Sequence, residues 1–575
     1  MRTTFNFPGL ATAAVLFALP LATLTSAQDV SVWIRQFEAD ERTLARRYPT
    51  PLERYATELR KETLAGWKRK LDGCKFDQLD RDNQIDYLLL RSEVEYRIKK
   101  LAIDSARDEA AANMLPYSET LVEFCRAREE VEPISPEQIA EKLNQAAAQA
   151  EAETATIQAI DPDQRDDDTV RLRLRTLRAC ELIREIARSV AEADSFYRGY
   201  HPEYSWWAEA PIARLKTALT NHRTALRNKV VGVPDSDKDT IVGLPIGADG
   251  LKLELQHEWI AHSPEELVAL AKREMAWCDA EMEKASRSLG FGDDWRAAME
   301  HTKSKHVAPG EQPQMIKALA WEAIRFLESH DLVTVPPLAA SGWRMTMMSP
   351  ERQRVNPYFL GGDQIIVSFP TNTMTHDEKL TSMRSNNEHF SRATVHHELI
   401  PGHHLQHYML PRHRPHRSLF STPFWIEGWA LYWEMLLWDL EFAQSDEDRV
   451  GMLFWRKHRC ARIIFSLGYH LGEMTPEECI DYLVDRVGHE RNAATAEVRR
   501  SIMGGYSPLY QAAYMLGGLQ LRRMHQDWVQ SGKMTNREFH DAILQQHAMP
   551  IEVLRLALSD TPLTKSQTST WKFAD

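Results

Sequence analysis

The chain has 575 residues, and 43% of them are hydrophobic, which is enough apolar material for a large buried core. Its formal charge is -12, from 70 Lys and Arg against 82 Asp and Glu, and this acidic balance argues against a nucleic-acid partner. With 25 Gly, 28 Pro and no fixed-period repeat, the composition also argues against collagen-like, solenoid and disordered chains.

The first 27 residues have the pattern of an export signal. Arg2 supplies a positive start, residues 10–24 are apolar and uncharged, and small residues stand at positions 25–27. The apolar run is short for a membrane span of about 20 residues, and no cysteine follows it for a lipid anchor. We therefore expect cleavage after Ala27 and secretion across the inner membrane to the periplasm, with no stable membrane insertion afterwards.

The cysteines are scattered and form no C-x-x-C pair, so neither a cysteine zinc site nor a dense disulfide scaffold is indicated. An exported chain could still form one or two disulfides, and the alternative is buried thiols in helices. The sequence does not pair the six residues, which are Cys74, Cys125, Cys180, Cys278, Cys460 and Cys479.

Residues 28–240 are expected to form an N-terminal helical half. From Val30 to about Asn228 apolar residues recur at spacings of three and four, which is typical of long amphipathic helices. The segment 231–250 is rich in Gly, Pro and Asp and predicts an irregular connection. Residues 250–575 are expected to form a C-terminal catalytic half that continues the same mostly α fold. Within it Ser263, followed by Pro and two acids, predicts the start of a helix.

One small sheet is expected in this helical chain, near residues 355–370. Residues 358–360 and 365–369 are apolar except for Ser368, and most are aromatic or β-branched. Between them Gly361-Gly362-Asp363 has the composition of a tight turn. The pattern predicts a β-hairpin.

Histidines cluster after the predicted sheet, where eight of the 22 lie between His389 and His416. In the H-E-x-x-H motif two histidines one turn apart hold zinc, and the adjacent glutamate activates the metal-bound water. Here His397 and Glu398 are followed by His403, six residues after the first histidine. Six residues turn an ideal helix by about 600°, which places the two rings roughly 120° apart. A regular helix therefore does not bring both histidines to one ion.

The Pro-Gly pair at 401–402 offers a solution. Proline lacks the N–H that would bond the carbonyl of His397, and glycine tolerates unusual dihedrals, so we expect a local bulge that returns His403 to His397. His397 and His404 share a face but lie two turns, or about 10 Å, apart along an ideal axis, which is too far for one zinc ion. His404 and His396 stay open as replacements for a predicted ligand.

A third ligand is expected from residues 424–434, an aromatic and apolar segment with two acids seven residues apart. Glu427 and Glu434 share a helix face, and an acid on so apolar a segment is costly to bury unless it is paired or bound to a metal. Gly428 permits the close approach of a second helix. Glu427 is therefore the predicted third ligand, and Glu434 is the predicted partner that orients a histidine.

Two motifs carry a resemblance to a known family: His397-Glu398-x-x-Pro401-Gly402-His403-His404-x-Gln406 and Glu427-Gly428-Trp429-Ala430-x-Tyr432-x-Glu434. They resemble the hallmark pair of the bacterial proteins grouped as domain of unknown function 885 (DUF885), similar in pattern to the zinc peptidases carboxypeptidase Taq, neurolysin and angiotensin-converting enzyme. Further matches extend the resemblance over about Ser263 to Arg522. They are Arg459-x-x-Arg462, Gly468-x-His470, Glu497-Val498-x-Arg500 and Pro508 to Gly517, with departures at Ser466 and Tyr510.

The resemblance implies a large helical peptidase fold with a deep central channel, in which an edge strand pairs with the backbone of a peptide substrate. The stretch from Gln364 to Phe369 is the expected strand. The resemblance also implies that a phenol or imidazole from a distant C-terminal helix stabilises the oxyanion. Tyr514 matches the family position, and Tyr510, four residues earlier, shares its helix face.

We therefore expect one zinc ion per chain, bound by His397, His403 and Glu427, and zinc-dependent hydrolysis of short peptides in the manner of a carboxypeptidase or dipeptidase. Glu398 is expected to take a proton from zinc-bound water, and Tyr514 to stabilise the oxyanion.

Further substrate contacts are expected around these catalytic groups. A terminal carboxylate requires a cation. The candidates are Arg462, His470 and Arg500, with Tyr510 and Gln364 as additional contacts. Two alternatives stay open: a non-catalytic periplasmic protein that binds zinc or peptides, and a metallohydrolase of another amide or ester.

Overall fold

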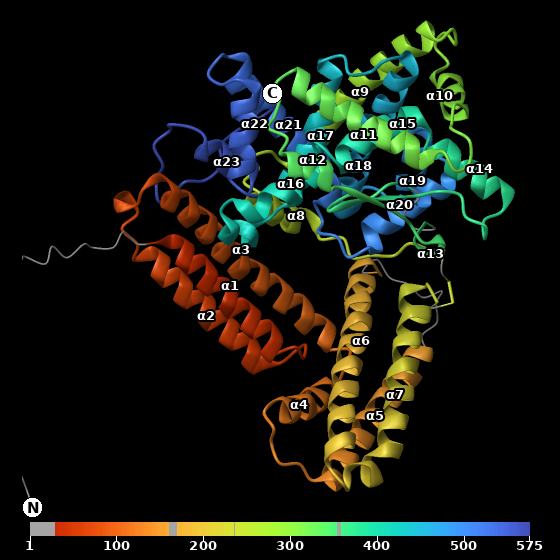
Figure 1. Cartoon of the computed structure of the whole chain (residues 1–575). Helices are drawn as coiled ribbons and strands as arrows, with labels where there is room; N and C mark the ends of the chain where they lie inside the picture. Colours follow the sequence, from red (N-terminus) through yellow and green to blue (C-terminus); the bar gives the residue numbers. More distant parts are fainter. Residues whose placement is uncertain (1–28, 160–168, 235, 238, 354–357, 575) are drawn as a thin grey trace, which may run out of the picture.

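The computed structural model describes residues 29–574 apart from 160–168, 235, 238 and 354–357. The predicted leader and its cleavage point lie outside the described residues. Helices dominate the described part of the chain, which contains one small sheet, so the predicted mostly α class is confirmed (Figure 1). None of the described helices combines the length and the apolar content that a membrane crossing needs.

Long helices form the N-terminal part, as the spacing of apolar residues predicts. They are α1 (Val30–Arg47), α2 (Arg54–Asp72), α3 (Arg81–Ala112), α4 (Ser118–Glu129), α5 (Pro136–Gln158), α6 (Thr169–Tyr200) and α7 (Tyr204–Ala225). Helix α3 links two hydrophobic cores, because Val94 packs in the main core and Ala111 packs in a second core with α5, α6 and α7. In Figure 1 these three helices project from the main body. Helices α1 and α2 belong to the main core.

The C-terminal part begins after a segment without regular structure. The described residues between 232 and 246 form no helix or strand, which confirms the predicted irregular connection. The next helices are α8 (Gly247–His257), α9 (Pro264–Ser288), α10 (Trp295–Ser304), α11 (Gln312–Ser329), α12 (Pro337–Gly342) and α13 (Pro350–Gln353). Helix α9 starts where the sequence predicts, because Ser263 and Glu266 each accept a hydrogen bond from the backbone N–H of the other.

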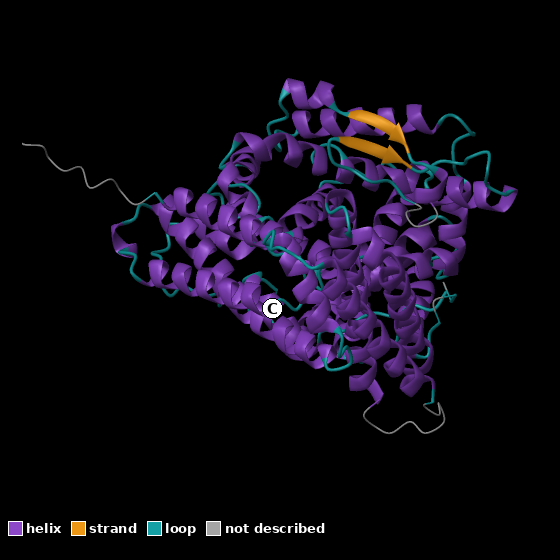
Figure 2. Ribbon diagram, turned by 90° about the horizontal axis from the view of Figure 1, so that it is seen from below, coloured by secondary structure: helices purple, strands orange, loops and turns teal. Residues whose placement is uncertain are grey.

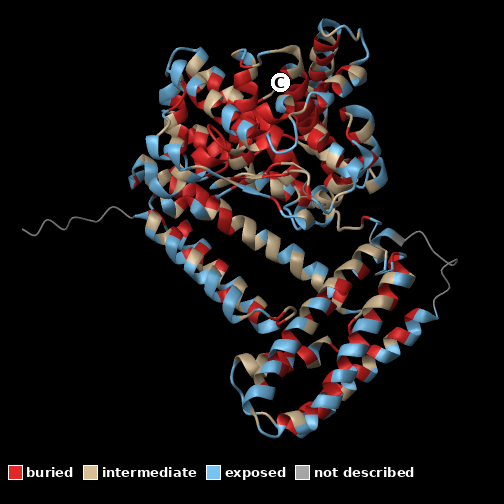
Figure 3. Ribbon diagram, turned by 45° about the vertical axis from the view of Figure 1, so that its right-hand side comes forward, coloured by how far each residue is buried: buried red, intermediate tan, exposed pale blue. Residues whose placement is uncertain are grey.

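The remaining helices surround the densest part of the main core. They are α14 (His376–Ser385), α15 (Glu388–Glu398), α16 (His403–Met409), α17 (Pro423–Asp439), α18 (Asp446–Leu471), α19 (Pro476–Val487), α20 (Arg491–Met503), α21 (Tyr510–His525), α22 (Asn536–Gln545) and α23 (Ile551–Ala557). Helix α17 is buried on almost all sides, and its tryptophans Trp425, Trp429 and Trp433, which share one face, are fully buried. Buried residues accordingly concentrate in the main body in Figure 3.

The predicted hairpin is wrong in its strand partner. The sheet pairs β1 (Arg344–Met347) with β2 (Gln364–Val367), and the two strands run parallel, in register from Arg344 opposite Gln364 (Figure 2). Of the antiparallel pairing expected between residues 358–360 and 365–369, the structure has one isolated bridge, between Leu360 and Ile366. The four residues of β1 alternate polar and apolar side chains, but the run is too short to predict a strand, and their burial does not alternate because most of them are exposed.

All six cysteines are buried, and none of them forms a disulfide bond. Of the two alternatives left open by the sequence, the structure therefore has buried thiols.

Candidate metal centre

The first question is how two histidines six residues apart come together. The expected distortion at Pro401-Gly402 does return His403 to His397, but it divides the helix in two, because α15 ends at Glu398 and α16 begins at His403. The backbone N–H of Gly402 donates to the carbonyl of His396 at 3.0 Å. A Cβ atom on Gly402 would lie 1.8 Å from the carbonyl oxygen of His397, so this close return of the chain requires glycine.

This break places three predicted ligands around one point. The Nε2 atom of His397 lies 3.6 Å from Oε2 of Glu427, and Nε2 of His403 lies 3.2 Å from the same oxygen. One potential ligand atom from each residue lies within 4.8 Å of the others, and all three residues are buried. Two imidazole nitrogens and one carboxylate oxygen are a donor set that suits a catalytic zinc ion and leaves a position open.

An orphaned oxygen supports this fit. Oε2 of Glu427 is buried and has no hydrogen-bond partner among the described residues. A buried, charged oxygen without a partner is costly, and a metal ion among the three side chains would satisfy it. The other oxygen, Oε1, accepts a hydrogen bond from the hydroxyl of Tyr510 at 2.6 Å.

Both histidines are oriented through their second ring nitrogen. Nδ1 of His397 lies 2.7 Å from Oε1 of Glu434, the partner that the sequence predicts. Nδ1 of His403 lies 3.0 Å from Oε1 of Gln406, whose amide donates to the carbonyls at the start of α17. Such partners hold Nε2 toward the centre of the site. The orienting role of Gln406 was missed, although the residue stands three after His403, within reach on one helix.

Close helix packing delivers Glu427 and the tyrosines. A Cβ atom on Gly428 of α17 would lie 2.6 Å from Cα of Gly517 on α21, so the two helices touch through glycine as the small residues predict. This contact lets Tyr510 reach Glu427. The ring of Tyr514 lies nearly parallel to that of His397, with centroids 6.2 Å apart.

The charges of the site stabilise a cation at its centre. Burial opposes charging of His397, but the nearby carboxylates of Glu427 and Glu434 outweigh it and raise its pKa to about 9. Burial also opposes ionisation of Glu427, yet the nearby His403 and His397 hold its pKa well below the usual value. Burial raises the pKa of Glu398, whose Oε2 lies 4.0 Å from Nε2 of His403. The metal cluster, which we define as His397, His403, Glu427 and Glu398, is therefore rich in carboxylates.

The alternative histidines point elsewhere. Nε2 of His404 lies 3.1 Å from the carbonyl oxygen of Ala339, so this ring is directed toward α12. The ring of His396 packs edge-on against Phe442, and burial lowers its pKa to about 4. Neither residue joins the metal cluster.

The small sheet closes one side of the site. A Cβ atom on Gly361 would lie 2.1 Å from Oε2 of Glu398 and 2.8 Å from its carbonyl oxygen, so the turn before β2 lies directly against the predicted base. The sequence indicated this glycine only as part of a turn. The stretch from Gln364 to Phe369 is not the free edge that was expected, because β1 covers one side and Leu360 exchanges two backbone hydrogen bonds with Ile366 on the other.

A second buried polar group lies beside Tyr514. Nε of Arg462 lies 2.7 Å from Oε1 of Glu497, and the Arg462 guanidinium lies 4.5 Å from the ring centre of Tyr514. Nδ1 of His458 lies 2.8 Å from Nε2 of His489. We call this group the arginine cluster. Its members are Arg459, Arg462, Arg500, Glu497, His458 and His489.

The remaining predicted cation does not join this cluster. His470 lies in the last turn of α18, and burial lowers its pKa to about 4, so its ring is neutral near pH 7. Neutral imidazole cannot pair with a carboxylate as a cation does.

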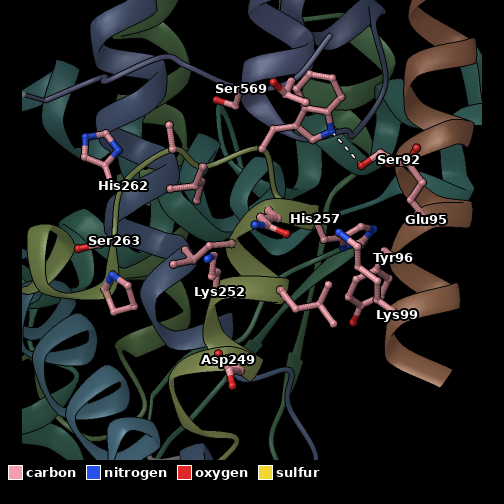
Figure 4. Close-up of a pocket in the computed structure, with 18 of the residues that line it drawn as sticks. Ser92, Glu95, Tyr96, Lys99, Asp249, Lys252, His257, His262, Ser263 and Ser569 are labelled. Atoms are coloured by element: carbon pink, nitrogen blue, oxygen red, sulfur yellow. Dashed lines mark hydrogen bonds between the residues drawn. The ribbon is translucent and has the colours of Figure 1, made fainter. Parts of the chain in front are cut away.

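A separate cavity of about 750 Å³ lies between α3, α8 and the C-terminal tail (Figure 4). There Tyr96 stacks on His257 with ring centroids 3.9 Å apart, and Trp259 donates a hydrogen bond to Ser92 at 3.1 Å. None of the predicted site residues lines this cavity.

Comparisons with known proteins agree on the fold. The family described as "Bacterial protein of unknown function (DUF885)" matches residues 41–558. The structure of a candidate lipoprotein of unknown function from Shewanella oneidensis is similar with a TM-score of 0.66 at 16% identity, over 92% of this chain and 99% of that chain. A candidate lipoprotein from Colwellia psychrerythraea is similar with a TM-score of 0.56 at 17% identity, over 92% and 97%. No curated protein matches the chain.

Proposed function

The chain belongs to this bacterial family of unknown function, DUF885, and on the geometry of the site we propose that it is a zinc metallopeptidase that hydrolyses short peptides. The observation that carries the proposal is the convergence of His397, His403 and Glu427 on one point, with the orphaned Oε2 of Glu427 among them. Glu398 beside them is not needed to hold a metal, which favours an enzyme over a zinc-binding protein.

Different residues of the chain have different roles in the proposed hydrolysis. Zinc, when bound by His397, His403 and Glu427, would act as a Lewis acid on the scissile carbonyl. Glu398 accepts a proton from the attacking water and returns it to the leaving amine, and burial helps by raising the pKa of this carboxyl. The charge that develops on the carbonyl oxygen requires a donor.

Tyr514 is the better of the two candidate donors. The hydroxyl of Tyr510 already donates to Oε1 of Glu427, so its proton is engaged in holding that ligand. The ring of Tyr514 lies against His397 and beneath the Arg462 guanidinium. Tyr514 therefore supplies a phenol beside the metal cluster and within the field of a cation, which favours hydrogen-bond donation to an oxyanion.

Export to the periplasm is part of the proposal. The pattern of the first 27 residues supports it, as does the description of two similar structures as candidate lipoproteins.

The test combines metal analysis with digestion. Protein purified without chelator should contain about one zinc ion per chain and should cleave members of a short-peptide library. A chelator should abolish cleavage, and added zinc should restore it. Protein that binds zinc but cleaves no peptide would support the non-catalytic alternative, and protein without affinity for zinc would refute both readings of the site.

A further inference from the structure

Another cavity, separate from the metal cluster, lies between α2, the C-terminal end of α3, and α4. Its volume is about 720 Å³, and none of the predicted metal ligands lines it. Pockets that hold small organic molecules have volumes of about 300–1,000 Å³. The cavity also joins the two hydrophobic cores, because Leu64 of α2 packs in the main core and Leu121 of α4 packs in the second. A ligand here would contact both parts of the fold.

Glu53 is a buried acid in the lining of this cavity. It stands at the start of α2, and only 4% of its surface is exposed. Neither of its carboxylate oxygens has a hydrogen-bond partner among the residues that the structure describes. A buried carboxyl group without a partner costs free energy whether it is ionised or protonated. A hydrogen-bond donor bound in the cavity would remove this cost.

The charges around Glu53 favour a cation as that donor. Burial and the nearby carboxylate of Glu129 raise the pKa of Glu53, and the attraction of Arg126 and Arg60 does not offset them. One oxygen of Glu129 is itself buried and has no hydrogen-bond partner in the described part of the chain. Two neighbouring acids with unpaired oxygens repel an anion and attract a positive charge.

The exposed part of the lining has the groups for a second positive charge. Tyr55 is 55% exposed, and the side chains of Glu58 and Glu119 are 65% and 74% exposed. The two acids face Lys61 and Arg54, but such exposed ion pairs are weak, so a ligand can compete for the carboxylates. An aromatic ring adds an apolar and cation-attracting surface between the buried and the exposed acids.

A bare metal ion fits this cavity less well than an organic cation. Ions such as Ca²⁺ require several oxygen ligands around one point. Within the described residues, the one group of three or more potential metal ligands is that of the metal cluster. The acids of the present cavity are instead spread from its buried side to its exposed side, which suits a ligand with separated charges.

We propose that this cavity, which we call the Glu53 cavity, binds a linear aliphatic diamine or polyamine. One ammonium group bonds the carboxylate of Glu53, and its three N–H donors are enough for both unpaired oxygens. The alkyl chain lies against Tyr55, and a second ammonium group reaches the exposed acids. This binding function is independent of zinc and of peptide hydrolysis.

Calorimetry of the whole purified protein with the diamine putrescine measures this binding. Wild type should bind about one equivalent, and Glu53→Gln should bind about 10- to 100-fold more weakly, because an amide lacks the charge that pairs with ammonium. Butylamine should bind up to about fivefold more weakly than putrescine, since the acids that it does not reach are exposed. The neutral butanediol should not bind. The control is E62Q, an exposed acid of α2 outside the cavity, which should bind as wild type does.

Thermal unfolding separates binding from a structural role of Glu53. Without ligand the Tm of E53Q should equal or exceed that of wild type, because the variant removes a buried and unpaired carboxylate. Putrescine should raise the Tm of wild type and E62Q but not that of E53Q. A lower Tm of E53Q without ligand would show that Glu53 stabilises the fold by itself, which would overturn the proposal.

The remaining outcomes also decide. Absence of putrescine binding by wild type, or equal binding by E53Q, would refute the site. Loss of binding after zinc is removed with a chelator would place the diamine at the metal cluster instead. Calcium that binds in a Glu53-dependent manner, without any binding of putrescine, would make the Glu53 cavity a metal site and would likewise refute the proposal.

Discussion

Two buried groups of histidines and carboxylates lie in the same core and differ in the charges that surround them. In the metal cluster acids dominate, and the nearby carboxylates of Glu427 and Glu434 raise the pKa of His397 to about 9 against the effect of burial. In the arginine cluster burial, Lys303 and arginines lower the pKa of His489 to about 3. The same side chain therefore favours a cation in one place and excludes it in the other, so charge balance decides where a metal can bind.

The largest expected effect compares a histidine from each cluster. His403→Ala should lower zinc affinity by more than the 10- to 100-fold that removal of an orienting partner costs, and activity should fall with it. His489→Ala should retain about one zinc ion per chain, because its ring lies among arginines. His404→Ala is a second control, since that ring bonds the carbonyl of Ala339. Metal analysis after dialysis measures the zinc content of each variant. Zinc loss in H489A with retention in H403A would show that the arginine cluster, and not the metal cluster, binds the ion.

The second prediction separates metal binding from catalysis within the metal cluster. Glu398→Gln keeps the size of the side chain but cannot accept the water's proton, so kcat should fall about 10²- to 10⁴-fold while zinc content stays the same. Metal analysis and steady-state kinetics on one preparation measure both. If the variant keeps most of its kcat, a residue other than Glu398 accepts the proton.

The third prediction concerns the residue between the two clusters. The ring of Tyr514 lies near His397 of the metal cluster and near Arg462 of the arginine cluster. Tyr514→Phe should leave zinc content and Tm nearly unchanged, while kcat falls about 10²- to 10³-fold through loss of an oxyanion donor. Tyr510→Phe should instead weaken zinc binding, because it removes a hydrogen bond to Glu427. If Y514F is fully active and Y510F retains zinc but loses kcat, the donor is Tyr510.

The helical class, the start of α9 and the predicted metal ligands could be predicted from local sequence patterns, but other parts of the fold and the site could not. Periodicity predicts the helical class, and capping residues predict the start of α9. The composition around His397, His403 and Glu427 singles out the residues that the structure brings together. The form of the break after Glu398 depends on dihedral angles that periodicity does not describe, and a bulge was predicted in its place.

Contacts between segments that are distant in the sequence were harder to predict than the helices. Strand β1 has only four residues, most of them exposed, and it pairs with β2 across a connection that contains α13, so its short local pattern does not indicate the pairing. The arginine cluster assembles from α18, α20 and His489 in the loop before α20, and the sequence does not show that these residues face one another. The contact of Gly361 with Glu398 likewise joins a turn to a helix, which only tertiary packing specifies.

That contact supplies the last and smallest prediction. An alanine at Gly361 would place Cβ 2.1 Å from Oε2 of Glu398 and 2.8 Å from its carbonyl oxygen, so the turn or the carboxylate must move. Gly361→Ala should lower kcat by up to about 10²-fold through misplacement of the base, with zinc content retained because Glu398 is not a ligand. Gly342→Ala is the matched control, since a Cβ there meets nothing within 4 Å. If both variants are equally active, the turn does not position Glu398, and the metal cluster depends on its helices alone.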